Sequence, residues 1–268
     1  MKLYIHSYSS YRSDVETENI KQILKQKYKY DTRRQDDFIL LGVYGAYMLK
    51  ESCNILPDDE LYITSGIGNI DVLQKCCRHV YEKNQLIRPF DFINSVGNTL
   101  SYHIAKSLQL KGKNIFQISD NFTYLHTLIL IYASLTMSKK SAIIGTIDHI
   151  SEEFEEIARK ASGIDEKTTM FSSVNFQKLS LKEENALAEI DFENDLYTLE
   201  EIKNIMQTFD GNIKCSIRCK KLDCTKEQNF FETEISNAVN QTLESKQNLL
   251  YVDCYNDKYK ILRVRYLK

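Results

Sequence analysis

The sequence predicts a layered α/β protein, and two observations support this. Strand-like and helix-like segments alternate through the first 150 residues of the 268-residue chain. After residue 150 the sequence becomes more charged and carries four further strand-like segments around one amphipathic helix. We therefore expect one domain, with a first half over residues 1–150 and a shortened second half over residues 151–268 on the same core.

The first elements follow from hydrophobic periodicity. "KLYIHSY" alternates apolar residues, as a strand does. An aspartate at residues 36–37 can cap the next helix, "FILLGVYGAYMLKESC", which is apolar nearly all round and should be packed on both sides. A strand over residues 61–64, a helix over 70–82 and a second helix that starts at residues 94–95 follow.

The elements after residue 110 are more apolar. "GKNIFQIS" predicts a strand, residues 122–135 a buried helix, and "KSAIIGTIDHI" another strand. In the second half, strands are expected in "ALAEIDF", "NIKCSIRC", "NLLYVDC" and "YKILRVRYL", with a helix over residues 227–244 between the second and the third.

Composition excludes several classes of protein. The net charge is −2, so no global basic field attracts nucleic acid. The longest apolar stretch, residues 125–137, is interrupted by polar residues and is shorter than the roughly 20 residues that a membrane span needs. The N-terminus also lacks the apolar region of a signal peptide. We expect a cytoplasmic protein.

The seven cysteines are scattered, which favours reduced thiols over a disulfide framework. Cys215, Cys219 and Cys224 do not have the spacing of common zinc sites, and no histidine follows them. We interpret them as small packing residues of a strand, and Cys76 and Cys77 as packing residues of a helix. Neither a metal nor a cofactor is expected.

Four stretches in the same order resemble the N-terminal half of β-ketoacyl synthases, over roughly residues 35–150. They are "YITSGIGN", "RPFDFINSVGNTLSYHIAKSLQLKG", "GKNIFQISDNFTYLHTLILIYASL" and "KSAIIGTIDHI". The resemblance implies a thiolase-like αβαβα architecture. The pair Arg33 and Arg34 ahead of the apolar helix is similar to the chain-length factors, a branch that pairs with true ketosynthases in aryl-polyene, flexirubin and aromatic polyketide systems.

The same resemblance places Asn121 where a ketosynthase has its nucleophilic cysteine. The family also needs two histidines from its C-terminal half, whereas all five histidines here lie within the first 149 residues. "LLYVDC" resembles the strand before the first of them, but no histidine follows it. Acyl transfer needs an activated thiolate or alkoxide, which Asn121 cannot supply. We expect Asn121 to be an ordinary helix N-cap and condensation to be lost.

Other polar residues of this half have structural interpretations. His126 lies on a different helix face from Asn121, so we expect a buried, hydrogen-bonded histidine. The glycines of residues 66–69 lack the rest of a dinucleotide or phosphate-binding motif, and a tight turn is expected there.

The resemblance also implies partner surfaces. In the thiolase-like fold the strand before the elbow pairs with its counterpart across a dimer axis, and that pairing would cover an edge prone to aggregation. The interface candidates are Asn114, Ile115, Phe116, Gln117, Ile118 and Ser119. The candidates for walls of an acyl tunnel or of the interface are Phe92, Phe116, Phe122 and Tyr124. The candidates for a basic rim that binds an acyl carrier protein are Arg33, Arg34, Arg88, Lys111 and Lys113, for which a solvated face is an equal alternative.

Together these features imply a catalytically silent, chain-length-factor-type subunit. It would form a heterodimer with an active β-ketoacyl synthase in polyene, polyketide or fatty-acid-like biosynthesis, shape the acyl tunnel, and meet an acyl carrier protein transiently. Two alternatives remain open: a stand-alone acyltransferase or hydrolase that uses the thiolase-like cavity, and a homodimeric scaffold without catalysis.

Overall fold

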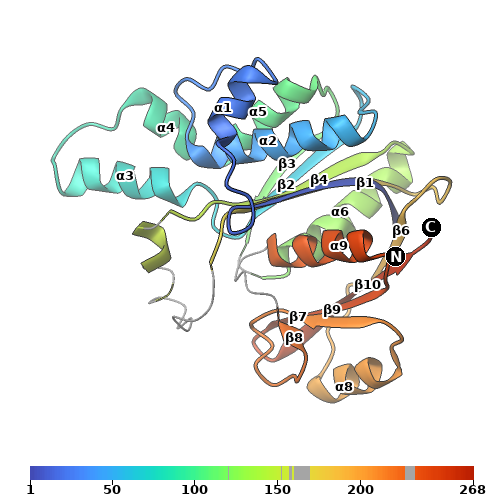
Figure 1. Ribbon diagram of the computed structural model, residues 1–268. Coiled ribbons are helices and arrows are strands. Elements are labelled where there is room, and N and C mark those ends of the chain that lie inside the picture. The colour runs from blue at the N-terminus through green and yellow to red at the C-terminus, as the bar shows by residue number, and fades with distance from the viewer. Residues whose placement is uncertain (120, 152, 157–158, 160–169, 227–232) are drawn as a thin grey trace.

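A computed structural model describes residues 1–268 except 120, 152, 157–158, 160–169 and 227–232. Within the described residues, ten strands form one mixed sheet in the order β3-β2-β4-β5-β1-β6-β10-β9-β7-β8. Helices lie on both outer sides of this curled sheet and between its two arms, so the layers alternate α, β, α, β, α (Figure 1). The predicted layered fold is confirmed.

The sheet is assembled from two sets of five strands. The first set consists of β1 (Lys2–Arg12), β2 (Glu60–Ser65), β3 (Asn114–Ile118), β4 (Ala142–Asp148) and β5 (Ser173–Ser180). The second set consists of β6 (Ala188–Phe192), β7 (Asn212–Cys215), β8 (Thr225–Lys226), β9 (Leu249–Tyr255) and β10 (Lys258–Tyr266).

The two sets repeat one topology. In each, the strands lie in the order third, second, fourth, fifth, first. In each, the second strand is parallel to the third and the fourth, and the fifth is antiparallel to the fourth. The fifth is also antiparallel to the first, and the two first strands pair antiparallel with each other, from Lys2 opposite Asp191 to Ile5 opposite Ala188.

Helices fill the three remaining layers. The central helices are α6 (Thr123–Ser138) and α9 (Thr233–Ser245), whose apolar side chains share one core with both strand sets. The first set is covered on its outer side by α1 (Ile20–Gln26), α2 (Asp37–Ser52) and α5 (Thr99–Leu108). The second is covered by α8 (Leu199–Thr208). Two further helices, α3 (Ile70–Tyr81) and α4 (Pro89–Ser95), extend from the first half (Figure 1).

The cap of helix α2 and its packing on two sides agree with the sequence-based prediction. The side chain of Asp36 accepts a hydrogen bond from the N–H of Ile39 at 3.0 Å and caps the helix. Gly45 lies so close to β5 that a Cβ there would stand 2.4 Å from Val174. The helix is therefore packed against the sheet on one side and against α1 and α5 on the other, as its apolar circumference predicts.

Several elements differ from the sequence-based expectation. Residues 94–95 end α4 instead of starting a helix, because Pro89 begins that helix at its first turn and α5 starts separately at Thr99. Strand β5 is not predicted by the sequence, because two of its side chains that face the central layer, Asn175 and Gln177, are polar. Helices α1 and α8 are short and also escaped prediction. Residues 227–232 of the last predicted helix lie outside the described residues.

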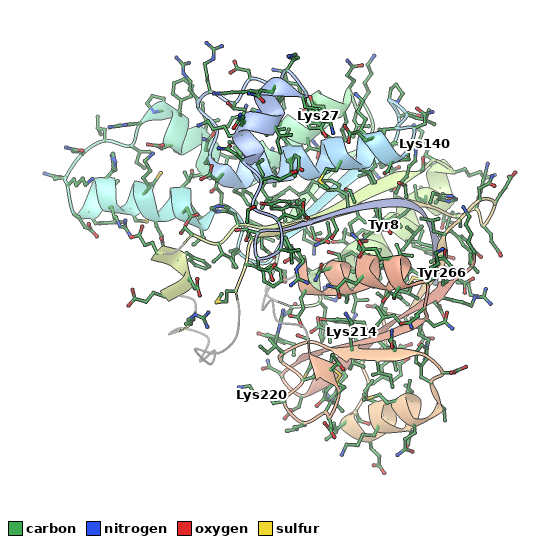
Figure 2. All side chains as sticks on the ribbon, viewed as in Figure 1. Tyr8, Lys27, Lys140, Lys214, Lys220 and Tyr266 are labelled. Atoms are coloured by element: carbon green, nitrogen blue, oxygen red, sulfur yellow. A yellow bond between two sulfur atoms is a disulfide. The ribbon has the colours of Figure 1, made fainter. Side chains whose placement is uncertain are left out.

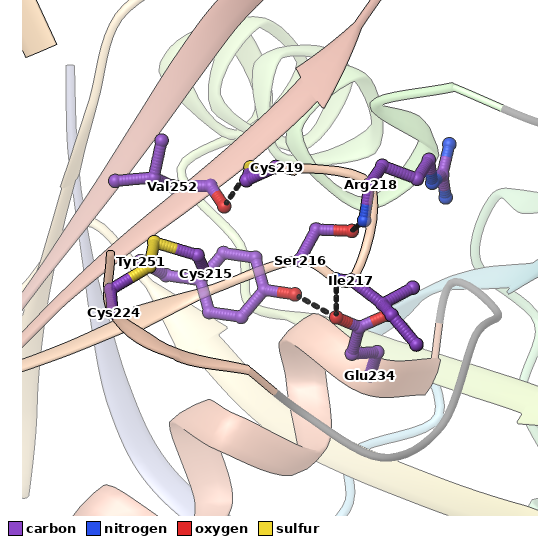
Figure 3. The surroundings of a disulfide bond; sticks show 9 residues. All are labelled: Cys215, Ser216, Ile217, Arg218, Cys219, Cys224, Glu234, Tyr251 and Val252. Carbon is purple, nitrogen blue, oxygen red and sulfur yellow. Dashed lines mark hydrogen bonds between the residues drawn. A yellow bond between two sulfur atoms is a disulfide. The ribbon is translucent and has the colours of Figure 1, made fainter. Parts of the chain in front are cut away.

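The cysteine interpretation was wrong in part. Cys215 and Cys224 form a disulfide, with their Cα atoms 6.2 Å apart (Figure 3). Strand β7 ends at Cys215, and Cys224 immediately precedes β8, which pairs in parallel with β7, so the sheet brings the two together. Cys219 and Cys254 are buried free thiols, whereas Cys77 is exposed and does not pack in a core.

Among the described residues, no helix is long and apolar enough to cross a membrane. The division of the chain at residue 150 stays a prediction. Strand β5, which follows that point in the sequence, lies between β4 and β1 of the first strand set.

Candidate functional site

The parallel strands β2, β3 and β4 bring their carboxyl ends to the same edge of the sheet. Ligands of open α/β sheets bind at such an edge, where loops and helix N-termini gather. Strand β3 leads there through a sharp turn into α6, and this turn is the elbow that the sequence predicts.

The apex of the elbow is Phe122 and not Asn121. Phe122 has left-handed backbone angles, φ 48° and ψ 25°, and is the N-cap of α6, with no side-chain cap hydrogen bond. Such strain at a strand-to-helix turn is typical of the position that carries a nucleophile. The expected N-cap role of Asn121 is therefore wrong. Its N–H donates instead to the hydroxyl of Ser119, at 3.3 Å.

A lysine of the second half reaches this elbow. The ammonium of Lys260, on β10, lies 5.7 Å from the centroid of the Phe122 ring, and its Nζ donates to Oδ1 of Asn194 at 2.9 Å. Lys260 is only 3% exposed, and burial lowers the pKa of its amine. Nothing in the alternating pattern of "YKILRVRYL" indicates that this lysine points inward.

His126 lies one turn after the apex, with its ring centroid 6.0 Å from that of Phe122. It is half-buried, and among the described residues its side chain makes no hydrogen bond, so the expected hydrogen-bonded histidine is wrong. Burial, followed by the charge of Lys260, lowers the pKa of His126. The elbow thus offers an aromatic apex beside a buried amine and an imidazole.

A fully buried carboxylate lies at the end of β4. Asp148 accepts hydrogen bonds from the Ser65 hydroxyl at 2.7 Å and from the N–H groups of Gly66 at 2.9 Å and Thr233 at 3.2 Å. Burial raises the pKa of Asp148 to about 6. Since Thr233 begins α9, Asp148 supplies an acceptor to a helix of the other half. Gly68 in the adjoining turn has φ 61°, consistent with the tight turn that the sequence predicts.

A second group of buried acids lies near the start of α9. Oε1 of Glu234 accepts from the N–H of Ile217 and from the hydroxyl of Tyr251, both at 3.0 Å (Figure 3). Burial and the neighbouring Asp253 raise the pKa of Glu234 well above its usual range. Sequence reasoning missed these acids, because an acid inside an amphipathic helix or strand normally faces water.

A third polar group joins β4 to α3. His149 Nδ1 and Asp71 Oδ2 are 2.9 Å apart, and the Ser151 hydroxyl donates to Asp71 Oδ1 at 2.5 Å. Burial raises the pKa of Asp71, but these two hydrogen bonds outweigh it and the pKa is lower than usual. Across the described part of the chain, no group of three or more histidine, cysteine or acidic side chains is placed to hold a metal ion.

The four tunnel candidates do not come together. Tyr124 is completely buried in the central layer, where its hydroxyl donates to Gln177 at 3.0 Å. Phe122, the N-cap of α6, packs in the same core. Phe116 packs on the outer side of β3, with the core formed by α2 and α5. Phe92 is 60% exposed on α4.

The carrier-protein rim candidates form two separate groups. Arg34 lies 4.3 Å over the Phe90 ring, and Arg88 is the N-cap residue of α4, without a side-chain cap hydrogen bond. The chain after α4 lies at the carboxyl end of β3, where a Cβ on Gly97 would stand 4.0 Å from Ile118. Arg33 pairs with its neighbour Asp31. Lys111 and Lys113 precede β3 at its other end. Five residues of strand separate the groups by about 16 Å, so they do not line one rim.

The predicted interface strand lies at the edge of the sheet. Among the described strands, β3 pairs with β2 alone, which leaves its other side unpaired. Its residues are exposed or half-buried, and Ile118 keeps 48% of its surface in solvent. Such an edge is a place where another chain can pair.

No protein-family model matches the sequence, and no curated protein matches it. Solved structures do. The ishigamide ketosynthase/chain length factor superposes with a TM-score of 0.77 at 10% identity, over 100% of both chains. The ketosynthase ApeO in complex with its chain length factor ApeC, from Xenorhabdus doucetiae, gives 0.62 at 10% identity, over 98% of this chain and 99% of that one.

A third match is AntDE:AntF, a type II PKS acyl-carrier protein in complex with its ketosynthase, which gives a TM-score of 0.66 at 10% identity over 99% of both chains. At these identities the matches show a common fold. The chain has the thiolase-like fold of the ketosynthases, as the sequence resemblance predicts.

Proposed function

We propose that this chain is a ketosynthase-like subunit of the chain-length-factor type, without condensing chemistry of its own. It pairs with an active β-ketoacyl synthase in polyene, polyketide or fatty-acid-like biosynthesis and helps to shape the acyl tunnel of that enzyme. The solved structures with the same fold include ketosynthases described with a chain length factor and one in complex with an acyl carrier protein, which supports this proposal.

The observation that carries the proposal is the aromatic apex of the elbow. Covalent acyl transfer needs a thiolate or an alkoxide at this point, and Phe122 supplies neither. The fold around the apex is nevertheless intact, with β3, the strained turn and the buried helix α6 in place. A fold that keeps its elbow without a nucleophile suits a subunit whose partner performs the chemistry.

The unpaired edge of β3 supplies the surface for pairing. An antiparallel contact between this strand and the matching strand of a partner would extend the sheet and bury the exposed Ile118. The acyl carrier protein would be met transiently. A cytoplasmic location belongs to the same proposal; five of the seven cysteines are free thiols.

Affinity purification from the native host, with mass spectrometry of the retained proteins, tests the proposal. We expect stoichiometric recovery of a second ketosynthase-like protein that has its cysteine and two histidines intact. The purified pair should condense acyl and malonyl thioesters, and the present chain alone should not. Recovery of this protein only as a homodimer would reject the heterodimer and favour a scaffold.

The buried amine at the elbow favours one alternative, a stand-alone acyltransferase or hydrolase. Lys260 and His126 flank Phe122 and could act on a thioester without a thiol. This alternative predicts that the isolated chain turns over an acyl thioester and that Lys260→Met abolishes the turnover. Full retention of condensing activity in Asn121→Ala, with no other subunit present, would also favour it.

A further inference from the structure

An open groove of about 700 Å³ runs beside the unpaired edge strand, between α6 and the start of β3. Its apolar wall consists of Ile115 on β3 and of Leu130, Ala133 and Met137 on α6. Leu130 is 46% exposed and Met137 is 88% exposed, although the opposite face of α6, with Leu128, Ile131 and Leu135, is completely buried. Positions 130, 133 and 137 are three and four residues apart, so they form one stripe along the helix.

Three lysines line the same groove: Lys111, Lys113 and Lys140. The acid among its lining residues is Glu60, which is buried and accepts a hydrogen bond from the Tyr62 hydroxyl at 2.7 Å. Lys113 donates to the Ser134 hydroxyl at 2.5 Å, and Lys140 lies 3.6 Å from Asp58. The Lys111 ammonium has no partner among the described residues. The groove is therefore positively charged at its exposed rim.

The loop that carries two of these lysines is held in place. The N–H of Lys111 donates to the carbonyl of Pro57 at 2.6 Å, and the N–H of Leu61 donates to the carbonyl of Lys113 at 2.7 Å. Gly112 packs against the backbone of Asp59 so closely that a Cβ would stand 2.4 Å from its oxygen. The lysines thus project from a fixed backbone that continues directly into β3.

We propose that this groove is part of the pairing surface and receives a segment of the ketosynthase partner in which carboxylates flank an apolar side chain. The apolar side chain would lie against Leu130 and Met137, and the carboxylates would meet the three lysines. The groove continues the free edge of β3, so a partner strand paired there would place its neighbouring residues over it. This inference rests on the proposed function.

Zero-length cross-linking of the purified pair with a carbodiimide tests the contact directly. The reagent joins a lysine amine to a carboxylate with loss of water, and only when the two groups touch. We expect amide cross-links from Lys111, Lys113 or Lys140 to aspartates or glutamates of the partner. The control lysines are Lys203, Lys220 and Lys246, which are exposed on the second half and should give none; Figure 2 labels Lys140 and Lys220 in separate regions.

Charge reversal supplies the second measurement. The triple variant Lys111→Glu, Lys113→Glu, Lys140→Glu should bind the partner at least about tenfold more weakly at 0.1 M salt, and the wild-type affinity should fall as salt rises. The matched triple variant Lys203→Glu, Lys220→Glu, Lys246→Glu should change the affinity less than twofold. Thermal unfolding of each variant alone shows whether it folds.

The outcomes separate this inference from the function on which it rests. If the partner is retained but the groove variant binds it normally and the cross-links arise elsewhere, the groove proposal is wrong and the heterodimer stands. Cross-links from these lysines to an acyl carrier protein, and none to the ketosynthase, would assign a different occupant and also overturn it. If the wild-type protein retains no ketosynthase, both the heterodimer proposal and the groove proposal are wrong.

Discussion

The two strand sets have the same order and the same strand directions, yet their surroundings differ. Helices α1, α2 and α5 cover the outer side of the first set, whereas among the described helices α8 covers the outer side of the second. The second set carries the Cys215–Cys224 disulfide instead, in a region with less helical cover. One topology can thus be supported by packing in one half and by a covalent link in the other.

The same comparison extends to the carboxyl ends of the strands. Asp148 at the end of β4 bonds to Ser65 at the end of β2, and Asp253 on β9 bonds to Ser216, which follows β7. A buried serine and aspartate therefore recur near the carboxyl ends of corresponding strands. Asp148 is surrounded by neutral donors, whereas Asp253 lies near Glu234 and the guanidinium of Arg218. The repeat therefore keeps an acid near the carboxyl end of its fourth strand, in a different electrostatic setting in each half.

The largest change in stability is expected from pH, through the buried Asp148 of the first half. The folded-state pKa of Asp148, about 6, lies above its usual value of 3.8, so the folded chain binds the proton more tightly than the unfolded chain. The free energy of unfolding should therefore be higher near pH 4 and should fall as the pH rises to about 6. This group alone should contribute a decrease on the order of 2–3 kcal/mol. Denaturant unfolding from pH 4 to 7 measures it. Asp148→Asn should remove this part of the pH dependence. If the free energy of unfolding of the variant changed with pH as it does in the wild type, Asp148 would not be its source.

Removal of the disulfide should have the next largest effect on the free energy of unfolding. The disulfide lies in the second half of the molecule. Closing a loop of nine residues stabilises the folded state by about 2.5 kcal/mol in the chain-entropy model. Cys215→Ala with Cys224→Ala should lower the free energy of unfolding by that amount, and reduction of the wild type should do the same. Cys53→Ala, at a half-buried free thiol, is the control. Insensitivity of the wild type to reductant would show that the link does not stabilise this half.

A smaller loss is expected in the central layer shared by both halves. The Tyr124 hydroxyl donates to Gln177, whose amide donates at 2.7 Å to Asn240 on α9. In Tyr124→Phe, the buried side-chain oxygen of Gln177 loses this hydrogen bond, and the free energy of unfolding should fall by about 1 kcal/mol. Tyr102→Phe, at a tyrosine 56% exposed, should cost almost nothing. Equal losses in the two variants would mean that this bridge between the halves is not specific.

The smallest effect on stability is expected at the edge of β3. Ile118→Lys should change the free energy of unfolding by less than about 0.5 kcal/mol, because nearly half of this side chain is already in solvent. The same change should nevertheless abolish pairing with the partner, since it places a charge at the strand edge. Analytical ultracentrifugation of the purified pair measures this. Normal pairing would place the contact elsewhere.

Most of the fold could be predicted from the sequence because the evidence is local. The apolar circumference of α2, its aspartate cap and the runs of β2, β3 and β4 are readable from neighbouring residues. Strand β5 escaped because two of its inward residues, Asn175 and Gln177, are polar and hydrogen-bond to Asn240 of α9 in the central layer. A polar residue that finds its partner only in the folded protein looks exposed in the sequence.

The alternation of strands and helices is readable from the sequence, because it depends on periodicity and turn residues within a few positions. The elbow and the edge position of residues 114–119 followed instead from the resemblance to the ketosynthases. The folded chain was needed to show that Phe122 and not Asn121 stands at the apex, and that Lys260 lies beside it. It was also needed to show that Cys215 bonds to Cys224 and that Asp148 bonds to Thr233 of the other half. These contacts depend on backbone angles at one residue and on how two strand sets close around α6 and α9, which no local pattern encodes.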